Sequence, residues 1–298
     1  MVGRNILEHE SISDFEMLTP TRTEFNLFDY ECVSNYLEIN CPDYIVHAAG
    51  LVGGIQANIN HPVDFLVKNF EMGKILLLAS RDKGINRVLN LGSSCMYPID
   101  AINPIREESI LQGPLEPTNE GYALAKVAVA KLCSYINKEN EMCNYKTLIP
   151  CNLYGRYDKF DERYSHMIPA VIKKIHEAKI AGEKSVSIWG NGKARREFMY
   201  AADFADFIFY AVKNYDKIPQ DLNVGLGYDY TINEYYQTIA KIIGYEGAFS
   251  HNLSMPIGMK QKLVDNCGLK KIGWEPKFSL EKGIQKVYEY YMEITSIK

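Results

Sequence analysis

The stretch "RVLNLGSS" (residues 87–94) is central to how this chain folds. Its first half is rich in apolar residues, and its second half consists of small residues. A short apolar run of this kind is typical of a buried parallel strand whose carboxyl end borders a ligand. The segments "DYIVHAAG" (43–50) and "YKTLIPCNLYG" (145–155) have the same form. We therefore expect three strands of one sheet.

Two segments with helical periodicity, residues 61–84 and 119–140, lie between these strands. Alternation of strands and helices predicts right-handed crossovers and an α/β fold, a Rossmann-like doubly wound parallel sheet with helices on both faces. Ligands of such sheets bind at the carboxyl ends of the strands. The strand-end segments "HAAG", "LGSSCMYP" and "PCNLYG" should therefore line one cleft.

The chain opens on "MVGRNIL", without the strand and glycine-rich turn that normally begin such a sheet. Gly3 is a candidate for the last glycine of that turn, and residues 4–9 are candidates for the start of its helix. Arg22 is a candidate partner for a ribose phosphate, which favours NADP over NAD; a solvated loop arginine is the alternative. Because the first strand normally lies in the middle of the sheet, we expect a shortened amino terminus. A chain without that strand and turn should bind NADP weakly or fold poorly.

The second half of the chain has a different pattern of helical and strand segments from the first. We predict that residues 1–155 form an NADP-binding Rossmann-like domain, to which segments near 200–225 return, and that residues 156–298 form mainly a smaller α/β substrate-binding lobe. Thr231 and Ser279 are predicted helix N-caps. The helical segments of this half are residues 165–183, 200–214, 231–244 and 279–294, with a strand and a polar turn in 185–200.

Composition narrows the class of protein. The net charge of -4 argues against a broad nucleic-acid surface. The seven cysteines are odd in number and form no C-x-x-C pair, which indicates free thiols in a reducing compartment. No apolar run has the length of a signal peptide or a membrane span, and no cluster of His, Cys and acidic residues has metal-ligand spacing. We predict a cytoplasmic protein without a metal, membrane or nucleic-acid partner.

The segment "EGYALAKVAVAKL" (120–132) places Tyr122 and Lys126 four residues apart at the start of a helix. Residues at this spacing lie on one helical face. An ammonium beside a phenol lowers the pKa of the phenol and makes it useful for proton transfer near neutral pH. The alternative from these residues alone is a surface tyrosine beside a solvated lysine.

The segments "LGSSCMYP", "EPTNEGYALAK", "NLYG", "SHMIPA", "WGNGKARREF" and "LGW" occur in this order. With them the chain resembles the GDP-L-fucose synthases, a family of extended short-chain dehydrogenase/reductases, over almost its whole length. That family epimerises GDP-4-keto-6-deoxy-D-mannose at C3 and C5 and reduces it at C4. The resemblance implies NADPH as the cofactor, a GDP-linked keto-sugar as the substrate, and a homodimer formed through helices that include the tyrosine helix.

The resemblance also implies catalytic roles. Ser93 would hydrogen-bond the substrate ketone, and Tyr122 would protonate the C4 oxygen as hydride arrives from NADPH. Lys126 would lower the pKa of the tyrosine and hold the nicotinamide ribose. Cys95 and His166 would be the two acid/base groups that inversion at C3 and C5 requires, because both carbons are alpha to the ketone. Taken alone, Cys95 can also be a buried small apolar residue and His166 a loop histidine.

Further contacts are implied position by position. The residues implied in cofactor binding are Gly3, Arg22, Asn26, Leu27, Ala48, Ala49, Leu91, Gly92, Ser93, Ser94, Tyr122, Lys126, Pro150, Asn152, Leu153 and His166. The residues implied in binding GDP or its sugar are Lys174, Trp189, Arg196 and Lys262; for Trp189, core packing is the alternative.

Three positions depart from the family pattern. Ile257 replaces an acidic residue that would hydrogen-bond the ligand, Leu51 replaces a basic or polar residue, and Gly121 replaces a proline. The loss of a polar partner can change which sugar is held. A reductase acting on another GDP-4-keto sugar, such as a heptose, therefore stays open. The missing glycine turn leaves a third possibility, a non-catalytic remnant.

Overall fold

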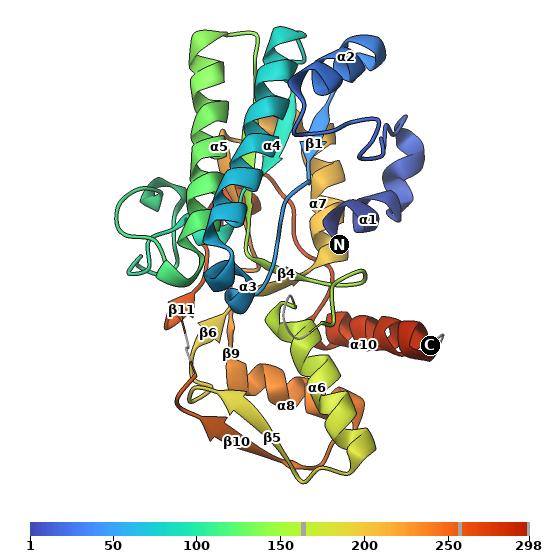
Figure 1. Cartoon of the computed structure of the whole chain (residues 1–298), viewed down its shortest axis with the longest axis vertical. Helices are drawn as coiled ribbons and strands as arrows, with labels where there is room; N and C mark the ends of the chain where they lie inside the picture. Colours follow the sequence, from blue (N-terminus) through green and yellow to red (C-terminus); the bar gives the residue numbers. More distant parts are fainter. Residues whose placement is uncertain (162–164, 256–257, 297–298) are drawn as a thin grey trace.

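The computed structural model describes residues 1–161, 165–255 and 258–296 (Figure 1). Ile257 lies outside the described residues. Helices α4 and α5 stand side by side at one end of the molecule, and β5, β10 and α8 form the other end. No helix in the described part of the chain is long and apolar enough to cross a membrane.

The larger sheet has four parallel strands in the order β1-β2-β3-β8. These strands are β1 (Ile45–His47), β2 (Val88–Leu91), β3 (Lys146–Pro150) and β8 (Asp221–Val224). Strands β2 and β3 are buried at every position, whereas β1, at one edge, is only half-buried. The predicted α/β fold with a parallel sheet is confirmed, and the runs ending at "HAAG" and "LGSS" each contain one of its strands.

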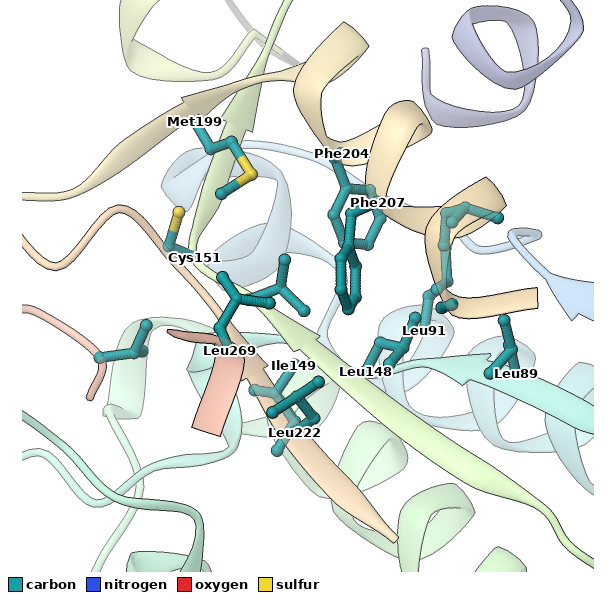
Figure 2. Packing of buried hydrophobic residues seen from close by; sticks show 14 of the residues in the cluster. Leu89, Leu91, Leu148, Ile149, Cys151, Met199, Phe204, Phe207, Leu222 and Leu269 are labelled. Carbon is teal, nitrogen blue, oxygen red and sulfur yellow. The ribbon is translucent and has the colours of Figure 1, made fainter. Parts of the chain in front are cut away.

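Helices cover both faces of this sheet. Neighbouring residues of β2 point to opposite faces, so they pack against different helices. Val88 belongs to an apolar cluster with Leu77 of α4 (Pro62–Asp82) and Val129 of α5 (Glu120–Glu139). Leu89 belongs instead to the main core, which also contains Phe204 of α7 (Ala201–Lys213). Figure 2 shows the side chains of this main core between β2, β3 and α7.

The predicted strand 145–155 is two strands in different sheets, so this part of the prediction is wrong. After Pro150 the chain leaves the larger sheet, and β4 (Asn152–Tyr154) pairs with β7 (Phe198–Tyr200). The change occurs where β8 ends at Val224, whose carbonyl accepts the backbone N–H of Cys151 at 3.0 Å. Asn152 then donates a hydrogen bond to the carbonyl of Glu197 at 3.0 Å.

The smaller lobe has its own apolar core. It contains the parallel pair of β5 (Ser185–Trp189) and β10 (Ala248–Asn252), and a three-stranded sheet in the order β11-β6-β9. The strands of that sheet are β11 (Gln261–Lys262), β6 (Arg195–Arg196) and β9 (Tyr230–Thr231). Its helices are α6 (Met167–Ala181), α8 (Ile232–Ile243) and α10 (Leu280–Ser296).

Both predicted N-caps are confirmed. Thr231 and Glu234 form a reciprocal capping box at the start of α8. Ser279 accepts the backbone N–H of Lys282 at 3.3 Å at the start of α10.

The remaining helices are α1 (Val2–Leu7), α2 (Tyr30–Asn40), α3 (Ile55–Asn60) and α9 (Cys267–Lys271), with short 3-10 turns η1 (Glu10–Asp14), η2 (Ser94–Met96), η3 (Glu107–Ser109), η4 (Pro117–Asn119) and η5 (Tyr215–Lys217).

Candidate active site

Three predicted catalytic residues come together where β2 ends. Ser93 follows β2 and accepts the backbone N–H of Cys95 at 3.2 Å, and it is hydrogen-bonded to the hydroxyl of Tyr122. The Lys126 ammonium donates to the carbonyl of Leu91 at 2.8 Å and lies 5.8 Å from the centre of the Tyr122 ring. The first turns of α5 therefore bring a phenol and an ammonium to the end of a buried strand.

The ionisation of Tyr122 differs from the prediction. Burial raises the pKa of Tyr122 above its usual value; the charge of Cys95 adds to this rise, and the hydrogen bond from Ser93 opposes it. Lys126 is not among the groups that shift the tyrosine, and its ammonium is directed at Leu91. The expectation that Lys126 lowers the tyrosine pKa is therefore wrong for this structure, because desolvation dominates. Burial lowers the pKa of Lys126 itself to about 8, and Cys95 opposes that shift.

Cys95 lies among polar groups from other segments. Asn119 Nδ2 donates to Cys95 Sγ at 3.3 Å, and Lys262 Nζ donates to it at 3.8 Å. Burial lowers the pKa of Arg196, and electrostatic interactions with Glu116 and Cys95 oppose this shift. Lys262 and Arg196 are direct neighbours in the β11–β6 register. A thiol, an amide and two cations therefore border the Ser93–Tyr122 pair.

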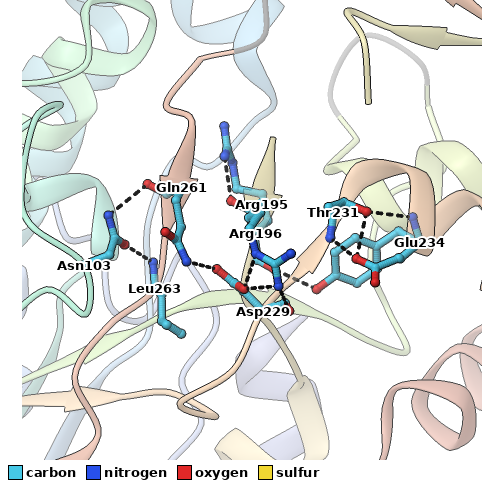
Figure 3. A network of polar contacts seen from close by, with 9 residues as sticks. Asn103, Arg195, Arg196, Asp229, Thr231, Glu234, Gln261 and Leu263 are labelled. Carbon is cyan, nitrogen blue, oxygen red and sulfur yellow. Dashed lines mark hydrogen bonds and ion pairs between the residues drawn. The ribbon is translucent and has the colours of Figure 1, made fainter. Parts of the chain in front are cut away.

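A polar network fixes the strands that carry these cations (Figure 3). Arg195 Nε donates to Asp229 Oδ1 at 2.7 Å, and Gln261 Nε2 donates to Asp229 Oδ2 at 2.7 Å. Asn103 Oδ1 accepts the backbone N–H of Leu263 at 2.7 Å. These bonds join β6 and β11 to loops on either side, so the positions of Arg196 and Lys262 are set by the fold.

Glu197 ties three segments together from inside the molecule. Its buried carboxylate accepts the backbone N–H groups of Leu226, Gly227 (2.9 Å) and Val264 (3.0 Å). Burial raises the pKa of this carboxyl to about 7, and the three N–H donors oppose the rise. Glu197 directly follows Arg196, so the loop after β8 and the residue after Leu263 are held against the cationic strands.

His166 occupies a separate part of the site. It immediately precedes α6, and its charge acts on the buried carboxyl of Asp158, whose pKa is raised mainly by burial. A Cβ on Gly54 would lie 2.6 Å from the carbonyl oxygen of Ser165, so the glycine turn before α3 passes close to the residue before His166. No hydrogen bond joins His166 to Cys95 or Tyr122 in the residues that the structure describes.

The strand-end residues implied in cofactor binding are adjacent in space. Ala48 and Ala49 follow β1 and are exposed, whereas Leu91, Gly92 and Ser94 at the end of β2 are buried. Pro150, at the end of β3, and the half-buried Asn152 and Leu153 complete the row. Ala48 and Ala49 are small and exposed, so their side chains do not block the approach of a flat ligand such as a nicotinamide to the strand ends.

The remaining cofactor candidates lie near the amino terminus. Gly3 is exposed and lies inside α1. Arg22 and Asn26 are exposed in the turns before α2, and Leu27 packs against the apolar cluster between α2 and α4.

Two substrate candidates belong to the smaller lobe. The Lys174 ammonium donates to the carbonyl of Ser187 in β5 at 2.6 Å, and Trp189, at the end of the same strand, is 42% exposed.

Two of the positions that depart from the family pattern, Leu51 and Gly121, also have local contacts. Leu51 exchanges two hydrogen bonds with Asn69, and a Cβ on Gly121 would lie 2.7 Å from a backbone oxygen at the start of α4.

Sequence reasoning missed three residues of this site. Glu116 and Asn119 stand in the segment "EPTNE", which contributed to the resemblance without a role for either side chain. Glu116 Oε2 and Asn119 Oδ1 are buried without a hydrogen-bond partner. Glu197 gave no signal, because its contacts come from residues about 30 and 67 positions away along the chain.

A serine, a tyrosine and a lysine at the strand ends of a Rossmann-like sheet define an NAD(P)-dependent oxidoreductase. The chain belongs to the NAD dependent epimerase/dehydratase family, whose model matches residues 2–225. It is therefore an enzyme, and the possibility of a non-catalytic remnant is set aside.

Several similar proteins are named for GDP-linked sugars. The chain is 57% identical to the GDP-L-colitose synthase of Yersinia pseudotuberculosis, over 98% of this chain and 95% of the relative. It is 48% identical to the GDP-L-fucose synthase of Azorhizobium caulinodans, over 98% and 93%. A solved GDP-mannoheptose C4 reductase from Campylobacter jejuni with NADP bound superposes with a TM-score of 0.87 at 29% identity, over 98% and 95%. The resemblance to the GDP-L-fucose synthases is confirmed.

Proposed function

We propose that the chain is an NADPH-dependent enzyme that epimerises GDP-4-keto-6-deoxy-D-mannose at C3 and C5 and reduces it at C4, giving GDP-L-fucose. One observation carries the proposal: Cys95, a proton-transfer group, is linked by its backbone N–H to Ser93, which is hydrogen-bonded to Tyr122. A simple reductase needs only the serine and the tyrosine. The thiol, with Asn119 and Lys262 against its sulfur, supports the added epimerisation.

The residues act in two stages. Ser93 and Tyr122 hydrogen-bond the C4 oxygen, which makes the protons at C3 and C5 acidic. Cys95 removes a proton from one of these carbons, and His166 returns a proton to the opposite face. Tyr122 then gives its proton to the C4 oxygen. Its raised pKa suits this role, because the phenol stays protonated at neutral pH.

The NADP-bound relative supports NADPH as the cofactor, which would supply the hydride that reduces C4. Lys126 and the strand ends at Ala48, Ala49 and Gly92 would hold its nicotinamide end. Arg22 is exposed and would face its ribose phosphate. His166, Asn152 and Leu153 would border the same ligand, and Lys174, Trp189, Arg196 and Lys262 would contact the GDP-sugar.

A second candidate is favoured by the relative that is 57% identical, a GDP-L-colitose synthase. Colitose is fucose without the C3 hydroxyl, so its 4-keto precursor needs inversion only at C5. The same Cys95, Ser93 and Tyr122 would serve this shorter reaction. The choice between the two substrates rests on the groups that meet C3.

The experiment compares kcat/KM for three substrates under one set of conditions: GDP-4-keto-6-deoxy-D-mannose, its 3-deoxy analogue and a GDP-4-keto-heptose. We expect the mannose-derived ketone to exceed the other two by about tenfold or more, since a site with polar partners discriminates strongly against a ligand without them. A tenfold preference for the 3-deoxy analogue would establish the second candidate. Turnover of the heptose alone would contradict both.

We further propose that the enzyme is a homodimer formed through α4 and α5. Val63, Leu66, Val67 and Phe70 follow helical spacing along α4 and are all exposed. Leu124 is exposed on α5, which packs along α4. Such a continuous apolar stripe on neighbouring helices supports burial against a second copy.

A further inference from the structure

Lys262 has an unusual environment for a lysine. Only 8% of its surface is exposed. Within the residues that the structure describes, the Cys95 sulfur, 3.8 Å away, is the sole hydrogen-bond partner of its ammonium. Burying an ammonium is costly unless a negative or strongly accepting group faces it. A neutral thiol is a weak acceptor, whereas a thiolate is a full counter-charge.

Two further cations interact with Cys95. Arg196 of β6, Lys126 of α5 and the phenol of Tyr122 each interact with a charge on Cys95. The carboxylate of Glu116 acts on Arg196. Lys262 therefore contacts the sulfur directly, and two further cations, Arg196 and Lys126, are near enough to interact with a charge on it. Cations next to a sulfur are typical of reactive cysteines.

We propose that Lys262 is a positioning residue that holds Cys95 as the thiolate and thereby makes it the base of the epimerisation. The inference rests on the proposed function and gives Lys262 a role beyond contact with the GDP-sugar. It requires the ammonium to stay charged while the sulfur changes its state. The β11–β6 pairing and the network around Asp229 keep the lysine in place.

The proton transfer balances without a further reactant. The Cys95 thiolate takes a proton from a carbon alpha to the C4 ketone, so a C–H bond breaks and an S–H bond forms. The electron pair of the C–H bond moves to the C4 oxygen, which becomes an enolate held by Ser93 and Tyr122. His166 then gives a proton to the opposite face of the carbon, and the enolate becomes a ketone again. Exchange with water removes the proton from Cys95 and restores the proton of His166.

The test measures alkylation of Cys95 by iodoacetamide, followed by mass spectrometry of the peptide that contains it. The rate at pH 7 is divided by the rate at pH 9, which cancels differences in access to the sulfur. Lys262→Met should lower this ratio about tenfold, because the thiolate loses its nearest cation. Lys262→Arg should keep it within about threefold of the wild type, because the positive charge is retained. An unchanged ratio in Lys262→Met would overturn the proposal.

Lys260→Met is the matched control. Lys260 is two residues away and exposed, and its substitution removes the same charge from the protein. We expect the wild-type ratio in this variant. An equal loss in Lys260→Met and Lys262→Met would show a general charge effect and would also overturn the proposal.

A measurement on the wild type alone tests the proposal even if Lys262→Met does not fold. Cys41 is exposed and serves as a reference in the same sample. Cys95 should retain a larger fraction of its pH 9 rate at pH 7 than Cys41 does. An equal or smaller fraction would contradict the proposal.

The alkylation experiment uses no sugar, so it separates this inference from the proposed function. Loss of activated Cys95 in Lys262→Met, with no turnover of any GDP-4-keto sugar by the wild type, would overturn the proposed function alone. Solvent deuterium exchange at C3 or C5 completes the test and should fall in Lys262→Met by about the same factor as the alkylation ratio. A raised KM for the GDP-sugar with unchanged alkylation would mean that Lys262 only binds the substrate.

Discussion

Tyr122 and Cys95 divide the proposed chemistry between two neighbouring side chains. Tyr122 is half-buried, and desolvation raises the pKa of its hydroxyl, so the phenol is suited to giving a proton. Cys95 is bordered by cations and is suited to taking one. Because the two roles belong to different atoms, substitutions should separate reduction from epimerisation.

Tyr122→Phe should lower the rate of C4 reduction by about 10²–10⁴-fold, since the positioned proton donor is lost. Solvent deuterium should still enter the substrate at the carbons alpha to the ketone, because Ser93 and Cys95 remain. NADPH oxidation and proton NMR in D2O measure the two activities side by side. Cys95→Ser is the reciprocal variant, and loss of both activities to the same degree in each would contradict this division.

Glu197 gives a pH dependence of stability whose sign follows from its raised pKa. Burial raises the pKa of this carboxyl to about 7, whereas in the unfolded chain it lies near 4.3. Between these values the folded chain keeps a proton that the unfolded chain releases. The stability that this group contributes is therefore fully present below about pH 4 and is lost as the pH rises through 7.

Glu197→Gln should remove this dependence while keeping the side-chain shape. From pH 5 to pH 8 the free energy of unfolding of the wild type should fall by about 2 kcal/mol relative to the variant. Urea unfolding of both proteins at several pH values measures the difference, and the comparison cancels groups that the two proteins share. A difference that does not vary with pH would refute the assignment.

Local patterns predicted the elements well wherever the signal was local. The periodicity of residues 61–84 and 119–140 predicted α4 and α5 almost to their ends, and the cap at Thr231 marked the start of α8. The break between β3 and β4 was missed, because "YKTLIPCNLYG" is a continuous apolar run. The run is divided because the residues before Cys151 pair with β8 and those after it pair with β7. A short stretch of sequence does not show which distant strand it will pair with.

The contact between α4 and α5 depends on a glycine. A Cβ on Gly73 would lie 2.5 Å from Val129, closer than packed atoms allow. Gly73→Ala should therefore push the helices apart and lower the free energy of unfolding by about 1–3 kcal/mol. The double variant with Val129→Ala should be less destabilised than the sum of the single variants.

Gly3→Ala is the control for this prediction. Gly3 also lies in a helix, but nothing is within 4 Å of its added Cβ, so the substitution should be neutral or stabilise by up to about 1 kcal/mol. Urea unfolding measures all four variants. Equal effects of alanine at positions 3 and 73 would show that helix packing is not the cause.

At the scale of the whole molecule, the motifs identified the catalytic serine, tyrosine and lysine candidates better than the groups that surround Cys95. Ser93, Tyr122 and Lys126 lie together as predicted, because each follows directly from a strand end or a helix start. The groups that meet Cys95 come from η4, β6 and β11, and only folding brings these segments together. The pKa of Tyr122 was predicted in the wrong direction because spacing reports a neighbour and not the depth of burial.

The proposed homodimer predicts a change in size on substitution of the apolar stripe. Val67→Asp on α4 should give a monomer, because a charge would be buried at the interface. Ile180→Asp on α6 is the control, since Ile180 is an exposed apolar residue outside the stripe. Light scattering after size-exclusion chromatography measures the mass. A monomeric wild type, or an unchanged mass in Val67→Asp, would argue against this interface.

The central claim is that one site carries out both proton exchange and reduction on a GDP-4-keto sugar. The most direct measurement is NADPH oxidation by the wild type with GDP-4-keto-6-deoxy-D-mannose in D2O, followed by NMR of the product. We predict one NADPH consumed per product, with deuterium at C3 and C5. NADPH consumption with no deuterium at either carbon would contradict the account.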